Sequence, residues 1–161
     1  MAVALLQQRR SDPAGALRTL SLLAPADASP PAVALLRARL LRESGQTDAA
    51  LTVLEGVVSP GAEIALERGE LLAEAKRPGE ALGEYLWALC ERADPSETLA
   101  RVQELWETGQ VRLGALLTGL GEGCAVLPDP SPVVQFVATR LPAADPAVQE
   151  WLAFHAGPAM G

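Results

Sequence analysis

The sequence predicts an all-α protein whose consecutive helical hairpins stack into a solenoid. Apolar residues make up 49% of the 161 residues and are mainly Ala and Leu, with a single isoleucine. This composition favours helices over strands. Two stretches that each read as a pair of helices also follow one another. Ala81 aligned with Ala50 gives an offset of 31 residues, and a period of roughly 20 to 50 residues is typical of stacked helical repeats.

Residues 1–24 are expected to form a shortened N-terminal hairpin of this single domain. Its first helix would cover Met1–Gln8. Asp12 can cap the second helix, because a carboxylate accepts hydrogen bonds from the free N–H groups of the first turn. Pro13 suits the first helical position. Ala24–Pro31 contains three prolines, so this stretch is predicted to be a linker.

Residues 31–59 are predicted to be the first complete hairpin. Its first helix would begin at Pro31 and end near Gly45, where a glycine can adopt the left-handed conformation that reverses the chain. The second helix is expected from about Thr47 to Val58. Its apolar residues fall on one face at helical spacing, and they are Ala50, Leu51, Leu54 and Val57.

Residues 62–92 are predicted to repeat this pattern. The expected helices cover about Ala62–Ala75 and Pro78–Arg92. Gly69 and Ala38 fall at equivalent positions of the two first helices. A small residue there would let the two helices of a hairpin approach each other closely.

Residues 95–120 are predicted to be a third, more degenerate hairpin. Asp94 and Glu97 have the spacing of a capping box, which indicates a helix start. The first helix would end at Gly109, the counterpart of the earlier turn glycine, and the second would cover about Val111–Leu120.

Three glycines, Gly119, Gly121 and Gly123, lie at the end of this unit. No strand precedes them and no Lys-Ser/Thr pair follows, so the pattern of a phosphate-binding loop is absent. We expect a helix end followed by a loop.

Residues 131–156 are predicted to be a pair of capping helices. Proline-rich breaks separate helices that are expected over about Val133–Leu141 and Ala147–His155. Repeat arrays need a terminal element that covers the apolar face of the last unit. Trp151 and Leu152 suit that role.

Several unit positions keep the same kind of residue. The close-approach position is Ala38 or Gly69, and the turn position is Gly45, Lys76 or Gly109. The second helices pair a small residue with a large one, as Ala16 with Leu20, Ala50 with Leu54, Ala81 with Tyr85, and more weakly Gly114 with Thr118. On these residues the chain resembles the tetratricopeptide repeat family, from about Pro31 to Leu117. The resemblance implies a right-handed α-solenoid that binds other proteins.

The resemblance also implies a partner-binding groove on the concave side, lined by the first helix of each unit. Three leucines would form an apolar line along its floor, with charged and polar residues beside them. The implied groove residues are Leu35, Arg39, Arg42, Leu66, Glu70, Glu74, Leu99, Gln103 and Trp106. Such a groove suits a peptide or an amphipathic helix of another protein. An interaction scaffold or adaptor is therefore the expected function.

Other interpretations stay open at this point. The three leucines could instead contact the core of the next unit, or the chain's own C-terminal helices could cover them. The chain could be a ligand-sensing repeat domain that acts with a bacterial transcription regulator. It could also form a homo-oligomer through an uncovered end of the array.

Composition argues against several other functional classes. The net charge of −7 opposes nucleic-acid binding, which needs clustered Lys and Arg. No apolar run approaches the ~20 residues of a membrane span, and no secretory signal pattern is present, so we expect a cytoplasmic protein without a membrane partner. His155 is the only histidine, and Cys90 and Cys124 lack metal-ligand spacing. We expect no enzyme, no cofactor and no metal site.

Overall fold

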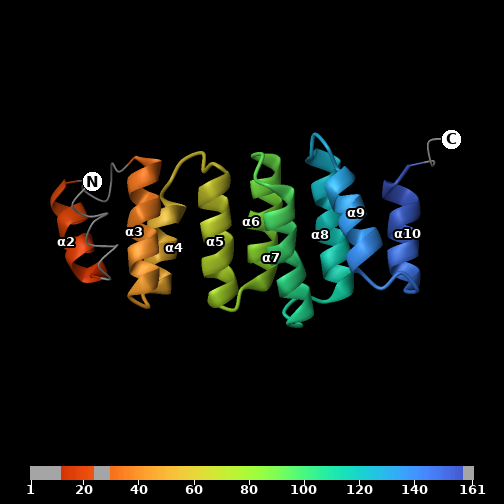
Figure 1. The fold of residues 1–161 in the computed structure, drawn as a ribbon, viewed down its shortest axis with the longest axis horizontal. Coiled ribbons are helices and arrows are strands. Elements are labelled where there is room, and N and C mark those ends of the chain that lie inside the picture. The colour runs from red at the N-terminus through yellow and green to blue at the C-terminus, as the bar shows by residue number, and fades with distance from the viewer. Residues whose placement is uncertain (1–11, 24–29, 158–161) are drawn as a thin grey trace.

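The computed structural model describes residues 12–23 and 30–157, and within these ranges it contains nine α-helices and no strand. The helices stand side by side and follow one another in chain order along the longest axis, with α2 and α10 at opposite ends (Figure 1). The prediction of an all-α fold is confirmed. The expected helix Met1–Gln8 and the predicted linker at 24–29 lie outside the described residues.

The helices pack as an array in which each one contacts its neighbours in the chain or the next but one. Their bounds are α2 Pro13–Leu23, α3 Pro31–Glu43, α4 Thr47–Glu55, α5 Ala62–Glu74, α6 Pro78–Cys90, α7 Pro95–Glu107, α8 Leu113–Val126, α9 Ser131–Arg140 and α10 Pro146–His155. Contacts join α3 to α4 and α5 to α6, and also α3 to α5, α6 to α8, α7 to α9, and α8 to α10. We call α3, α5, α7 and α9 the first row and α4, α6, α8 and α10 the second row.

The turns between the paired helices share one backbone conformation. Gly45, Lys76 and Gly109 have φ angles of +74°, +60° and +70°. The left-handed region is costly for a residue with a Cβ, by about 1–2 kcal/mol. Lys76 nevertheless adopts it, because the turn must reverse the chain at the same point in each hairpin. The lysine therefore replaces the turn glycine without changing the turn.

The third hairpin differs from its expected register. Its turn covers five residues between α7 and α8, whereas the two earlier turns cover three. Leu116 and Leu120 are consequently the fourth and eighth residues of α8, the places that Ala81 and Tyr85 hold in α6. Both leucines are fully buried, whereas the expected counterparts Gly114 and Thr118 are exposed. The unit looks degenerate in sequence because of this two-residue insertion.

The glycine-rich stretch is helical, so the expectation of a helix end and loop was wrong. Helix α8 continues through Gly119, Gly121 and Gly123 to Val126. A Cβ at Gly119 would lie 2.9 Å from Cδ2 of Leu82, and one at Gly123 would lie 3.0 Å from Cδ2 of Leu86. These glycines let α8 approach α6 closely, and this packing outweighs the poor helix propensity of glycine.

Close approach also shapes the second complete hairpin. A Cβ at Gly69 would lie 2.4 Å from Cε1 of Tyr85, so the tyrosine ring of α6 occupies the space that a side chain on α5 would fill. Helix α4, in contrast, ends at Glu55, three residues before the expected Val58. Gly56 follows it directly, and Val58 is exposed.

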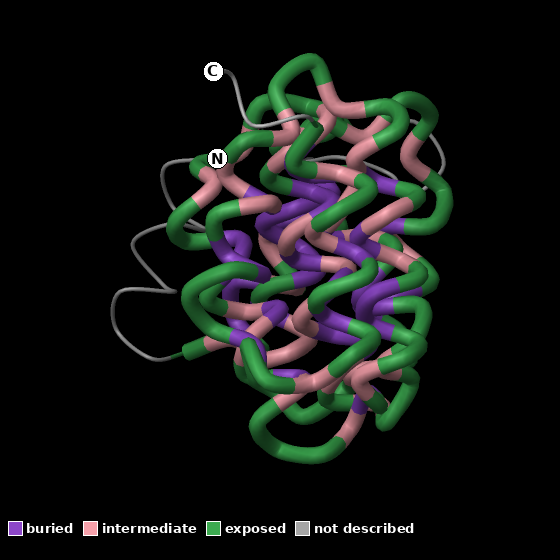
Figure 2. The backbone as a smooth tube through the Cα atoms, turned by 90° about the vertical axis from the view of Figure 1, so that its right-hand side faces the viewer, coloured by how far each residue is buried: buried purple, intermediate pink, exposed green. Residues whose placement is uncertain are grey.

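Aspartate side chains cap three helix starts, including the two predicted at Asp12 and Asp94. The carboxylates of Asp12, Asp94 and Asp145 accept hydrogen bonds from the N–H groups of Gly15, Glu97 and Ala147, each at 2.9 Å. The core runs along the middle of the array, and the turns at either end of the helices are exposed (Figure 2). Trp151 of α10 is buried, and its Nε1 donates to the carbonyl oxygen of Leu117 at 2.8 Å. This bond ties α10 to α8.

Candidate functional site

The three leucines expected along a groove floor do not form an exposed apolar line. Leu35 and Leu99 are only 7% and 6% exposed, and they belong to the main core. Leu66 is partly buried and packs against the same core. Each first-row helix has neighbours on both sides, so the residues that point toward the next hairpin are covered. Leu35 and Leu99 therefore fit the alternative interpretation, in which these leucines pack against the core of neighbouring units.

Charged side chains of three first-row helices meet instead, and Arg42 of α3 lies at their centre. Its Nε donates to Oε1 of Glu74 at 2.7 Å, and its Nη1 donates to Oε2 of Glu70 at 2.5 Å and to Oε1 of Glu67 at 3.2 Å. Nε of Arg39 donates to Oε2 of Glu67 at 2.9 Å. The contacts of Arg39 and Arg42 therefore join α3 to α5.

Arg101 of α7 extends the same network to the next helix. Its Nε donates to Oε1 of Glu70 at 2.7 Å, and its Nη1 donates to Oε1 of Glu97 at 3.0 Å. Glu70 thus accepts from Arg42 on one side and from Arg101 on the other. We call this surface the charged face, formed by Arg39, Arg42, Glu67, Glu70, Glu74, Glu97 and Arg101.

The electrostatics of Glu70 follow from this position. Burial acts to raise the pKa of its carboxyl, but hydrogen bonds from Arg101 and Arg42 and the charges of both guanidiniums outweigh that effect, so the pKa is lowered overall. Burial likewise acts to lower the pKa of Arg42, but the hydrogen bonds that Arg42 donates to Glu74 and Glu70, with the charges of both carboxylates, outweigh it, so the pKa is raised overall. Both groups are therefore held in their charged forms.

Two adjoining cavities open on the charged face. One, of about 440 Å³, is lined by Arg39, Arg42, Glu43, Glu67 and Glu74. The other, of about 500 Å³, is lined by Arg42, Glu70, Ala73, Glu74, Tyr85, Glu97, Ala100, Arg101, Glu104, Leu105 and Gln110. They share Arg42 and Glu74, so they adjoin at the ion pair between these residues. Together the cavities extend from α3 across α5 to α7.

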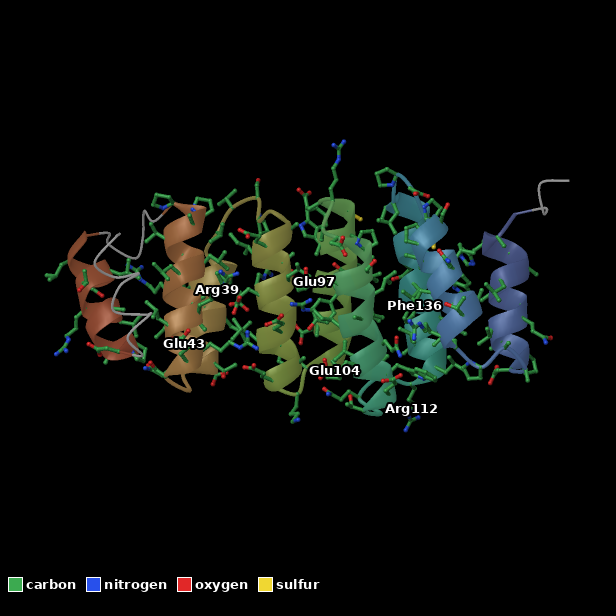
Figure 3. The ribbon with its side chains drawn as sticks, in the orientation of Figure 1. Arg39, Glu43, Glu97, Glu104, Arg112 and Phe136 are labelled. Carbon is green, nitrogen blue, oxygen red and sulfur yellow. The ribbon has the colours of Figure 1, made fainter. Side chains whose placement is uncertain are left out.

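A third cavity, of about 290 Å³, lies further along the same row, where α7 packs against α9. Gln103 and Phe136 are among its lining residues. Figure 3 shows Arg39 and Glu43 on α3, Glu97 and Glu104 on α7, and Phe136 on α9, spread along the first row. Trp106, which was expected in the groove, is partly buried and packs against the core.

The structure thus brings together four of the expected groove residues, namely Arg39, Arg42, Glu70 and Glu74. Glu67, Glu97 and Arg101 were missed by sequence reasoning. One signal was present, because Glu67, Glu70 and Glu74 follow the i, i+3, i+7 spacing of a single helix face. The partners of that face lie 25 to 32 residues away in the chain, so their approach depends on how the hairpins stack.

A further hollow, of about 460 Å³, lies between α8 and α10 in the second row. It is lined mainly by small and apolar residues, including Leu117, Trp151 and Phe154. Phe154 is 82% exposed. His155 stacks on Trp151 with ring centroids 4.0 Å apart, and its Nδ1 lies 2.9 Å from the carbonyl oxygen of Trp151.

Membrane-spanning helices and metal-binding clusters are absent from the described ranges. No helix there is long and apolar enough to span a bilayer, and no three His, Cys, Asp or Glu residues of 12–23 and 30–157 are grouped so that they could hold a metal ion. Cys90 and Cys124 are not disulfide-bonded, and burial raises the pKa of both thiols.

No protein-family model matches the chain, and no match was found among curated proteins or solved structures.

Proposed function

We propose that this chain is an interaction scaffold that binds a peptide segment of another protein across α3, α5 and α7. One observation carries the proposal, namely the two adjoining cavities of about 440 and 500 Å³ on the charged face. Cavities of this size accommodate side chains and small ligands. Because the two cavities lie one after the other across α3, α5 and α7, one extended peptide segment can occupy both cavities.

The surface favours polar recognition over an apolar helix face. Leu35 and Leu99 are buried, so a bound segment would meet carboxylates and guanidiniums. Charged groups across an interface contribute mainly to specificity and to the rate of association. A partner with complementary charge is therefore expected.

The ion pairs also hold the face in shape before a partner arrives. Glu70 connects α3 and α7 through two arginines, and Glu67 is only 6% exposed. A preformed surface loses less conformational entropy on binding. This preorganisation supports a binding role even though individual surface ion pairs contribute little stability.

Selection of peptides from a random phage library tests the proposal. Peptides enriched on the immobilised chain would be titrated by fluorescence anisotropy against Glu104→Arg and a matched control, Glu122→Arg. Both glutamates are exposed, but only Glu104 lines a cavity of the charged face. We expect Glu104→Arg to weaken binding at least about tenfold and the control to leave it unchanged. Absence of enrichment, or equal effects of the two variants, would refute the proposal.

Self-association is a second candidate, favoured by the exposed Phe154 beside the hollow between α8 and α10. A phenyl ring next to an apolar hollow can fill the same hollow of a second copy, as two-fold interfaces require. Light scattering should then show a dimer for the parent chain and a monomer for Phe154→Ser. A monomeric parent at high concentration would exclude this candidate.

A further inference from the structure

The larger cavity of the charged face has a surplus of negative charge. Two arginines and four glutamates line it. Arg42 and Arg101 are already engaged by Glu70, Glu74 and Glu97. Glu104 is exposed and has no ion pair with any residue that the structure describes. A cation entering the cavity would therefore meet an uncompensated carboxylate.

Helix ends add to this negative potential. Ala73 and Glu74 are the last residues of α5, and Glu104 and Leu105 lie in the last turn of α7. All four line the cavity. Because the C-terminal end of a helix has a partial negative charge, the two helices favour a positive group at the same place.

Tyr85 is a second, independent indication of a ligand. It is only 2% exposed and lines the cavity from α6, yet its hydroxyl has no hydrogen bond within the described part of the chain. Burial, with a smaller contribution from Glu70, raises the pKa of this hydroxyl to about 12, so the group stays neutral. The hydroxyl oxygen itself is not fully enclosed, so a donor that enters the cavity can bond to it in place of water.

Gln110 also lines the cavity, but its free acceptor does not open into it. Its Nε2 donates to Oγ1 of Thr108 at 3.0 Å, whereas its buried Oε1 has no hydrogen-bond partner among the described residues. The cavity thus has two acceptors that lack a donor within the described part of the chain, namely the Glu104 carboxylate and the Tyr85 hydroxyl oxygen. The Tyr85 hydroxyl can also donate, but an anion in the cavity would be repelled by the Glu104 carboxylate, whereas a cation would be attracted to it.

We infer that this cavity receives the guanidinium of an arginine side chain presented by a peptide segment of a partner protein. A guanidinium carries a positive charge and five N–H donors in a planar fork, which suits several acceptors at once. The three donors of an ammonium group diverge from one nitrogen atom, so they reach acceptors on different sides of a cavity less well than a planar fork does. The inference rests on the proposed peptide-binding function and names the class of residue that the face recognises.

Labelled nine-residue peptides would test it by fluorescence anisotropy at about 150 mM salt, where long-range attraction is screened. Four peptides of Gly and Ser would differ only in their three central residues, which would all be arginine, all lysine, all citrulline or all glutamate. Citrulline has nearly the shape of arginine without its charge. We expect the arginine peptide to bind at least about tenfold more tightly than the citrulline peptide, with lysine in between. Equal affinity for arginine and citrulline would overturn the inference.

Two variants locate the binding. Glu104→Gln should weaken binding of the arginine peptide several-fold, whereas Glu122→Gln makes the same charge change away from the cavity and should have no effect. Tyr85→Phe keeps the ring that packs on Gly69 and removes only the hydroxyl. It should weaken binding about tenfold, as expected for a hydrogen bond to a charged group, without lowering the melting temperature. Unchanged binding in both cavity variants would overturn the inference.

This failure is distinguishable from failure of the proposed function. The library could instead yield peptides that contain no basic residue and that no longer bind the Glu104→Arg variant. This result would support the proposed peptide-binding face and overturn the inference that it recognises arginine. Absence of any enriched peptide would overturn both.

Discussion

Replacement of Gly69 by alanine should destabilise the protein, although alanine is the better helix former. Glycine in a helix interior costs about 1 kcal/mol relative to alanine, so an unobstructed site would gain that amount. The added Cβ would lie 2.4, 2.7 and 3.1 Å from Cε1, Cδ1 and Cζ of Tyr85. This ring is 2% exposed and belongs to a packed helix, so it cannot move aside freely.

The size of the effect follows from these opposing contributions. Overpacking of this kind costs about 1–3 kcal/mol, and the severity of the 2.4 Å approach places Gly69 at the upper end. After the propensity gain is subtracted, a net loss of about 2 kcal/mol remains. At roughly 2–4 °C per kcal/mol for a chain of this size, the melting temperature should fall by about 4–8 °C.

Gly83→Ala is the matched control in the neighbouring helix α6. Nothing lies within 4 Å of a Cβ built at Gly83, so we expect a gain of about 0.5–1 kcal/mol. Urea and thermal unfolding followed by circular dichroism would compare the two variants with the parent chain. If Gly69→Ala proves as stable as Gly83→Ala, the close approach of α5 and α6 is not as described, and the position of Tyr85 in the cavity wall is refuted with it.

Three further predictions concern the turns, the ion pairs and the C-terminal helix. Lys76→Gly should stabilise the protein by about 1 kcal/mol, because it relieves a left-handed φ of +60°; a lower melting temperature would contradict this. Since the pKa of Glu70 is lowered from 4.5, its stabilising contribution is present above pH ~4.5 and is lost as pH falls through the lower folded value. The stability difference between the parent and Glu70→Gln should therefore shrink from pH 7 to pH 3 in urea titrations, and a constant difference would count against the network. Trp151→Phe should cost about 1 kcal/mol through loss of the hydrogen bond to Leu117, measured by thermal unfolding, and an unchanged midpoint would show that this bond is not important.

The third hairpin shows how far local patterns can be trusted. Asp94 and Gly109 were correctly assigned to a helix start and a turn, because both depend on backbone groups within a few residues. The register of α8 was not predicted correctly. The two extra turn residues put Leu116 and Leu120 at the helix positions that had been assigned to Gly114 and Thr118. Fixed-period alignment fails where a turn changes length.

The charged face illustrates a different limit. The i, i+3, i+7 spacing of Glu67, Glu70 and Glu74 places them on one side of α5 from the sequence alone. That Arg42 and Arg101 approach this side from opposite neighbours depends on the spacing and rotation of three helices. The lack of a partner for Tyr85 is likewise visible only once α5, α6 and α7 enclose a common cavity.

Local information in the chain determined that the protein is helical, where most helices begin and where the hairpins turn, because propensity, capping and the left-handed turn act over a few residues. Tertiary packing decided which residues are buried and which meet. It placed Leu35 and Leu99 in the core, kept Gly119, Gly121 and Gly123 helical against Leu82, Leu86 and Trp151, and paired Arg42 with carboxylates more than 20 residues away. These outcomes follow from the distance between neighbouring helices, which no single segment specifies.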